Sequence, residues 1–259
     1  MNYFLLRHVT LDKVKWCKET SKMILFNYLS KLKIFLVYIF FYLISVESAI
    51  SQSVTKEILL KLENGLNNRD FSVITKYFDE KDNKQIKKRF SKLIKDFPDS
   101  KWKIENKLGQ NYAKVKISGS KLINGKTFML ESNFRYDYFL KNGKIQNGTI
   151  KNHLTTIRND KNSIDINFSI PNDVLTGSNY DLDIILNEPL EDKMIVGGIK
   201  SHQTNYIFDQ SIKLEPLVAG GIFKVTRAPM KPGIQIWSGI IAHPEGLISF
   251  TKTVNIVKI

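Results

Sequence analysis

The spacing of apolar residues changes near Pro98 from the period of a helix to the period of a strand. Before it, apolar residues recur every three or four positions over 54–66, 71–78 and about 83–97, which predicts three helices. Asp70 is the expected N-cap of the second helix, and Pro98 is expected to end the third because proline disrupts helices. After Pro98, apolar and polar residues alternate, as they do in half-buried strands.

From residue 102 to residue 157 this alternation predicts four antiparallel strands. Asn124-Gly125 and Asn142-Gly143 are hairpin signals, because a type I′ turn needs two residues that accept positive φ. The longest run, 127–140, places several aromatic side chains on one face of its strand. Its other face carries Glu131, Asn133, Arg135 and Asp137, and the three charged residues among them predict a surface ion-pair row. Three helices followed by a strand meander predict an α+β layer fold, with helices packed on one face of a curved sheet.

Residues 164–259 follow a polar linker and show short alternating runs at near-regular spacing. About seven strands in fewer than a hundred residues predict a separate all-β sandwich, and Trp237 is expected in its core. The segment His243–Gly246 has the composition of a type I turn. The predicted domains are therefore 1–51, a leader, then 52–160, an α+β domain, and 164–259, a β-sandwich.

The first 51 residues have the three parts of a signal peptide. Lys31 and Lys33 precede an uncharged apolar run, 34–46, and the small residues Ser48, Ala49 and Ser51 follow it. The run is shorter than the roughly 20 residues that span a bilayer, which favours a cleaved signal and an exported protein. An uncleaved membrane anchor is the alternative. Translation that starts at Met23 would give the leader an ordinary basic N-terminus.

The net charge of +14 is concentrated in the middle of the chain, since residues 51–160 carry +11 and residues 161–259 carry −1. Such a region attracts anionic partners, although a solvated basic face explains it equally simply. Lys outnumbers Arg 33 to 6, which argues against specific nucleic-acid recognition. Candidates for contact with an anionic surface lie on the third predicted helix: Lys84, Lys87, Lys88, Arg89, Lys92 and Lys95. Cys17 is the one cysteine, so a mature chain without the leader has no disulfide and no thiolate ligand for a metal.

The first predicted domain resembles the nuclear transport factor two-like (ketosteroid-isomerase-like) cone. The resemblance is carried by Val54–Leu66, by Phe71–Phe78 with its Arg69-Asp70 entry, and by the meander that ends at 134–146. It implies an apolar pocket, with a carboxylate base in those members that are enzymes. No specific catalytic Asp aligns in this chain, and the nearest candidates are Asp137, Tyr136, Tyr138, Arg135 and His153. The pocket candidates that follow from the resemblance are Phe128, Phe134, Tyr136, Tyr138 and His153.

The two domains together resemble exported cyanobacterial proteins of unassigned function, with an immunoglobulin-like second domain that lacks the disulfide. This similarity rests on four segments: 180–185, 188–190, 220–224 and 236–246. It implies the periplasm or the thylakoid lumen and no particular activity.

No motif in the chain predicts a catalytic residue, a metal site or a cofactor. The leading hypothesis is a non-catalytic binding or assembly protein that binds another protein or a second copy of itself. The second is a carrier or enzyme with a small apolar ligand in the pocket, which requires a cavity of a few hundred Å³. The third is an envelope protein whose basic domain contacts anionic polymer or lipid.

Overall fold

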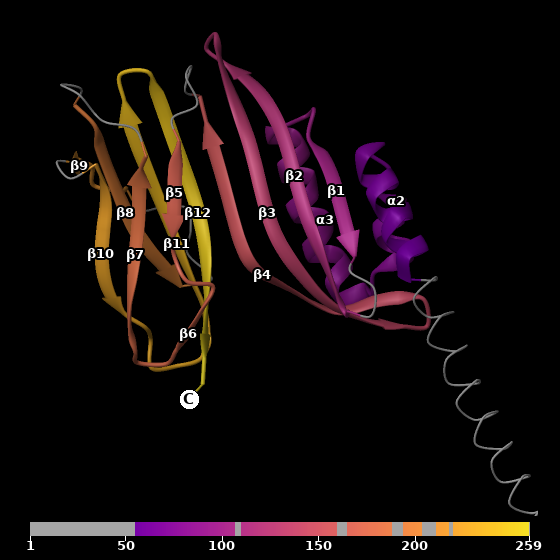
Figure 1. Ribbon diagram of the computed structural model, residues 1–259. Helices are drawn as coiled ribbons and strands as arrows, with labels where there is room; N and C mark the ends of the chain where they lie inside the picture. The colour runs from indigo at the N-terminus through magenta and orange to yellow at the C-terminus, as the bar shows by residue number, and fades with distance from the viewer. Residues whose placement is uncertain are drawn as a thin grey trace, which may run out of the picture. The chain divides into compact units, whose positions relative to one another are not determined.

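Helices precede strands, as the apolar spacing predicts. The computed structural model describes residues 55–106, 110–159, 165–187, 194–203, 211–217 and 220–258. Residues 55–67 are helical and are followed by α2 (Ser72–Tyr77) and α3 (Glu80–Asp96), both visible in Figure 1. Phe71 is the N-cap of α2, whereas Asp70, the predicted cap, accepts a hydrogen bond from the Ser72 amide at 2.9 Å. The predicted leader, with Cys17 and Met23, lies outside the described residues.

The next four strands form an antiparallel meander: β1 (Lys101–Asn106), β2 (Tyr112–Ile123), β3 (Lys126–Lys141) and β4 (Lys144–Arg158). Both predicted hairpin turns are confirmed. Asn124 and Gly125 have φ of 50° and 76°, and Asn142 and Gly143 have φ of 52° and 70°. Glycine and asparagine tolerate this left-handed region, so the two turns are fixed by local sequence.

The rest of the described chain consists of strands: β5 (Ile166–Ser169), β6 (Asp173–Leu175), β7 (Asn179–Leu186), β8 (Val196–Gln203), β9 (Glu215–Pro216), β10 (Gly221–Arg227), β11 (Gly233–His243) and β12 (Gly246–Val257). Strands β10, β7 and β5 pair as one small sheet, in that order. Strand β6 pairs in parallel with the end of β12, and the sequence pattern did not predict it. The β-rich character predicted for this half is confirmed.

The predicted fold class, an α+β cone plus a separate sandwich, is wrong. Strand β4 pairs with β12 from Ile248↔Arg158 to Lys252↔Leu154, which merges the meander with the later strands. The result, within the described residues, is a mostly antiparallel nine-stranded sheet with the path β1-β2-β3-β4-β12-β11-β8-β9 and β6 beside β12. Alternation in the sequence shows that a strand has one buried face, but it does not show which strand lies beside it.

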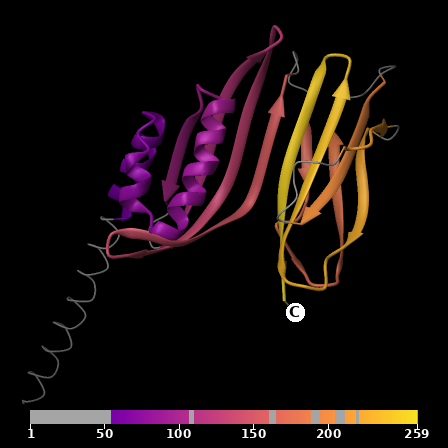
Figure 2. The ribbon, with the colours of Figure 1, turned by 180° about the vertical axis from the view of Figure 1, so that it is seen from behind.

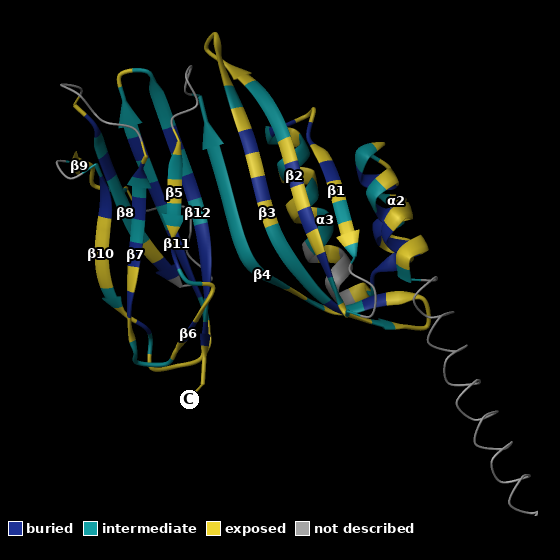
Figure 3. Ribbon diagram, in the orientation of Figure 1, coloured by how far each residue is buried: buried dark blue, intermediate teal, exposed yellow. Residues whose placement is uncertain are grey.

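Two hydrophobic cores flank this sheet. Figure 2 shows the helices in front of the meander, and Figure 3 marks the buried residues along the strands. The first lies between the helices and β1–β4, where Leu62 and Ile74 are almost fully buried. The second joins β7 of the small sheet to β11 and β12 of the large one, and it contains Leu182, Trp237 and Val254. The prediction that Trp237 is a core residue is confirmed, since its exposed fraction is 2%.

No helix within the described residues combines the length and the apolarity needed to cross a bilayer.

Candidate functional site: a cavity between the helices and the sheet

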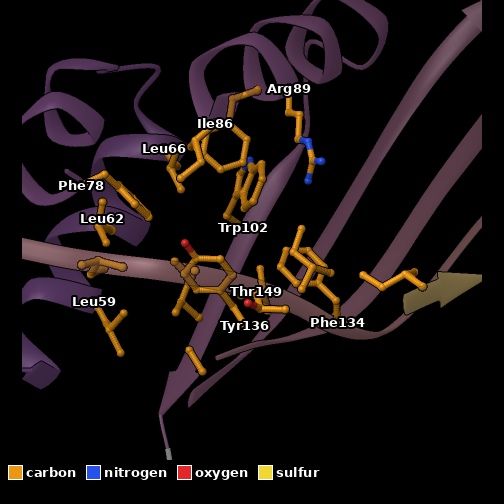
Figure 4. A pocket seen from close by; sticks show the side chains of 18 residues that line it. Leu59, Leu62, Leu66, Phe78, Ile86, Arg89, Trp102, Phe134, Tyr136 and Thr149 are labelled. Atoms are coloured by element: carbon orange, nitrogen blue, oxygen red, sulfur yellow. The ribbon is translucent and has the colours of Figure 1, made fainter. Parts of the chain in front are cut away.

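A cavity of about 290 Å³ lies between the helices and the meander (Figure 4). Its walls come from the helical segment 55–67, from α3 and from strands β1 to β4, and Ile234 of β11 adds one contact from the second half of the chain. The lining is mostly aliphatic and aromatic: Leu59, Leu62, Leu66, Phe78, Ile86, Arg89, Phe90, Trp102, Ile104, Ala113, Val115, Phe134, Tyr136, Ile145, Gly148, Thr149, Ile150 and Ile234. A concave, apolar site with few polar groups is the usual form of a small-molecule site.

Few polar side chains line this cavity. Arg89 is the charged residue among those that line it, and Figure 4 shows its side chain running from α3 toward the strands. Trp102 is only 5% exposed, and its buried indole N–H has no hydrogen-bond partner within the described chain. Tyr136 and Thr149 contribute hydroxyl groups. The cavity therefore offers mainly hydrogen-bond donors within an apolar wall.

The position of the Tyr136 ring depends on a glycine of the neighbouring strand. A Cβ atom at Gly148 would overlap the Tyr136 hydroxyl and ring, so a side chain there would displace the tyrosine. The ring is held edge-on to Phe78, with centroids 6.2 Å apart, and stacks on Tyr138 at 6.1 Å. Gly148 is thus a residue that shapes the cavity without contributing a side chain.

The five predicted pocket residues do not all reach the cavity. Phe134 and Tyr136 line it. Tyr138 lies behind Tyr136 in the core, 3% exposed, and burial raises the pKa of its phenol to about 12. Phe128 is half-buried near the β2–β3 hairpin, opposite Lys121 and away from the lining residues. His153 lies against the Phe134 ring at 6.0 Å and is not among the residues that line the cavity.

His153 is held in a small hydrogen-bonded group between β3, β4 and β12. Its Nε2 lies 2.7 Å from the Thr155 hydroxyl, and its backbone amide donates to the Thr253 hydroxyl at 3.1 Å. Burial, and then the charges of Lys252 and Arg89, lower its pKa from 6.5 to about 4. The imidazole is therefore neutral at pH 7 and is a structural hydrogen-bonding group.

Acid is expected to destabilise the protein through His153. Because the folded pKa lies below the unfolded value, the unfolded chain binds more protons between pH 6.5 and 4, and stability falls as the pH drops through that window. The shift corresponds to about 3 kcal/mol at most. Urea unfolding of the wild type and of His153→Asn at pH 7 and pH 4.5 measures how much stability each protein loses on acidification. The variant should lose less stability on acidification, and equal losses in both proteins would contradict the assignment.

The ion-pair prediction on the opposite face of β3 is confirmed for Arg135 and Asp137, which form a bidentate contact. Lys151 of β4 also pairs with Asp137 at 3.1 Å, and the Arg135 guanidinium lies 4.1 Å from the centre of the Tyr112 ring. Burial alone would raise the pKa of Asp137, but the hydrogen bonds from Arg135 and Lys151 outweigh it, and the pKa is lowered. Asp137 is therefore a paired, ionised surface group.

Arg89 differs from the lysines of α3 with which the sequence groups it, because Arg89 lines the cavity and the lysines do not. Lys84, Lys88, Lys92 and Lys95 are exposed on α3, and Lys87 is half-buried. Arg89 also has exposed surface, but it follows Ile86 by three positions and precedes Leu93 by four, so it flanks the apolar stripe that faces the sheet. That helical spacing is the signal that could have placed Arg89 at the cavity.

Sequence reasoning also missed the lining residues from other elements, among them Leu59, Trp102, Ala113 and Ile145. Each was expected to be apolar and buried, but periodicity does not distinguish a residue that faces a cavity from one that faces a neighbouring side chain. Across the described ranges, no group of three or more His, Cys, Asp or Glu residues is placed to hold a metal ion.

Residues 161–257 match the model of a family described as a domain of unknown function (DUF8623). The matched segment holds the strands from β5 to β12 and, of the residues that line the cavity, only Ile234. The comparisons with curated proteins and with solved structures gave no match. The family match therefore covers the second half of the chain, whereas nearly all of the cavity belongs to the first half.

Proposed function

We propose that the protein is a non-catalytic binding protein that holds a small, largely apolar ligand between its helices and its sheet. The observation that carries the proposal is the cavity of about 290 Å³ with its aliphatic and aromatic walls. This volume is close to the lower end of the roughly 300–1,000 Å³ of small-molecule sites. The signal-like run at 34–46 supports the further proposal that binding takes place after export.

Binding is a better account of this site than catalysis. The described residues that line the cavity include no carboxylate and no imidazole, which are the usual general bases. Asp137 is engaged in ion pairs on the other face of the sheet, and His153 bonds to Thr155.

Filling the cavity should abolish this binding. Ala113 is 1% exposed and lines the cavity, so Ala113→Leu places three further carbon atoms in the ligand's space. The neutral fluorophore 1-naphthylamine should bind the wild type saturably, with a rise in fluorescence, and should bind the variant at least about tenfold more weakly, equivalent to about 1.4 kcal/mol.

Lys114→Leu is the matched control, because Lys114 is the next residue of β2 and is exposed on its opposite face. It should bind the probe as the wild type does. Circular dichroism melting of both variants verifies that they fold. Equal affinity of the wild type and a folded Ala113→Leu variant would overturn the proposal, as would a wild type that does not bind the probe.

A further inference from the structure

Two polar groups of the cavity, the Arg89 guanidinium and the Trp102 indole N–H, can donate hydrogen bonds but cannot accept them. The Arg89 guanidinium has five N–H donors and no acceptor, and the Trp102 indole has one donor and no acceptor. Arg89 has no hydrogen bond or ion pair with another described residue, and the Trp102 N–H is buried without a partner. A ligand that supplies an acceptor pairs the buried Trp102 N–H, and Arg89, which has exposed surface, adds a positively charged donor from α3.

The electrostatics at this end of the cavity favour a negative charge. No carboxylate belongs to the described lining, so the charge of Arg89 is not neutralised there. Glu63, on the helical segment 55–67, accepts a hydrogen bond from the Ile104 amide at 2.6 Å and is not one of the lining residues. After burial, the charges of Lys252 and Arg89 both lower the pKa of His153, so the charge of Arg89 also reaches strand β4.

The size of the cavity limits the ligand. If each heavy atom takes about the 30 Å³ of a water molecule in the liquid, the cavity holds on the order of ten heavy atoms. Leu59, Leu62 and Leu66 form one wall and Val115 and Ile145 belong to another, so most of those atoms must be apolar.

We propose that the ligand is an amphipathic carboxylate of roughly ten heavy atoms. Its carboxylate accepts hydrogen bonds at Arg89, with the Trp102 N–H as a second donor, and its hydrocarbon part fills the apolar walls. A guanidinium binds a carboxylate through two parallel hydrogen bonds, which makes arginine more selective for this group than lysine. This inference rests on the proposed binding function and specifies its ligand class.

Three compounds that share an eight-carbon chain separate the effect of the head group from that of the chain: octanoate, 1-octanol and octyltrimethylammonium. Each is titrated at pH 7 against the protein loaded with 1-naphthylamine. Octanoate should displace the probe at a concentration at least about tenfold lower than 1-octanol, and octyltrimethylammonium should be the weakest. Arg89→Gln should remove the advantage of octanoate, and Trp102→Phe should reduce it while keeping the aromatic wall.

Lys88→Gln is the matched control, since it removes one positive charge from the adjacent, exposed position of α3. It should retain the preference for octanoate. Equal displacement by octanoate and 1-octanol, or an unchanged preference in a folded Arg89→Gln variant, would overturn the ligand class and leave the apolar site standing. Failure of 1-naphthylamine itself to bind would overturn the proposed function, and this inference with it.

Discussion

Trp237→Ala should lower the free energy of unfolding by about 3–5 kcal/mol, the usual cost of removing a large buried aromatic side chain. The residue is 2% exposed and belongs to the core between β7 of the small sheet and the strands β11 and β12. Its removal leaves a cavity between two sheets whose backbones are fixed by their own hydrogen bonds. The surrounding side chains therefore cannot close the space fully.

A polar chain adds to the loss. The Trp237 indole N–H donates to the Tyr180 hydroxyl at 2.9 Å, and that hydroxyl donates to the Gln235 side-chain oxygen at 2.8 Å. Without the indole, Tyr180 keeps one of its two bonds. Tyr180→Phe, which preserves ring volume, leaves both the indole N–H and the Gln235 oxygen unpaired and should cost about 1–3 kcal/mol.

Denaturant unfolding followed by circular dichroism measures both variants and the double variant. Because the two residues share one hydrogen-bonded chain, the double variant should lose less than the sum of the two single losses. A loss below 1 kcal/mol for Trp237→Ala would show that this core does not hold the two sheets together.

The elements that the sequence predicts well are those set by neighbours along the chain. The helical period before Pro98 and the alternation after it are local signals, and the Asn-Gly pairs at 124–125 and 142–143 take the positive φ that their turns need. Trp237 was predicted in the core because a large apolar residue within an alternating run is usually buried.

The pairing of distant strands could not be predicted in this way. Strands β4 and β12 are separated by about ninety residues, and each alternates in a manner that suits many partners. The short β6, only Asp173–Leu175, has too few residues to show a period, and its parallel pairing depends on where β12 ends. The error in the fold class follows from this unpredicted pairing of distant strands, because the polar segment 159–163 was interpreted as a boundary between separate domains.

The site was predicted only in part, because alternation shows which residues share a face of a strand but not which of them face the cavity. Phe134 and Tyr136 share a face of β3, which alternation shows, and both line the cavity. Tyr138 is two residues further along the same strand, but it lies behind Tyr136, and the pairing of β3 with β4 is shifted between Asp137 and Phe139. Arg89 was predicted on the surface and is exposed, but it also lines the cavity, which its charge did not indicate.

Thr155→Pro should be the most disruptive single change in the large sheet, with a loss above about 3 kcal/mol. Thr155 lies at the junction of the two halves of the chain, because it is paired with Ser132 of β3 and with Thr251 of β12. Proline in a strand flanked on both sides removes a ladder hydrogen bond and pushes its ring against a neighbour. Thr155→Val is the control: it keeps the amide and removes only the hydroxyl, which contacts Ser132 and His153.

Hydrogen exchange of the two halves distinguishes a shared sheet from two independent domains. In the wild type and in Thr155→Val, amides of β2 and of β11 should lose protection together as urea is added, because one sheet carries both. In Thr155→Pro the two groups of amides should separate, or both should exchange without urea. If they already exchange independently in the wild type, the β4–β12 pairing does not couple the halves. The cavity wall contributed by Ile234 would then no longer be held against Phe134 and Tyr136.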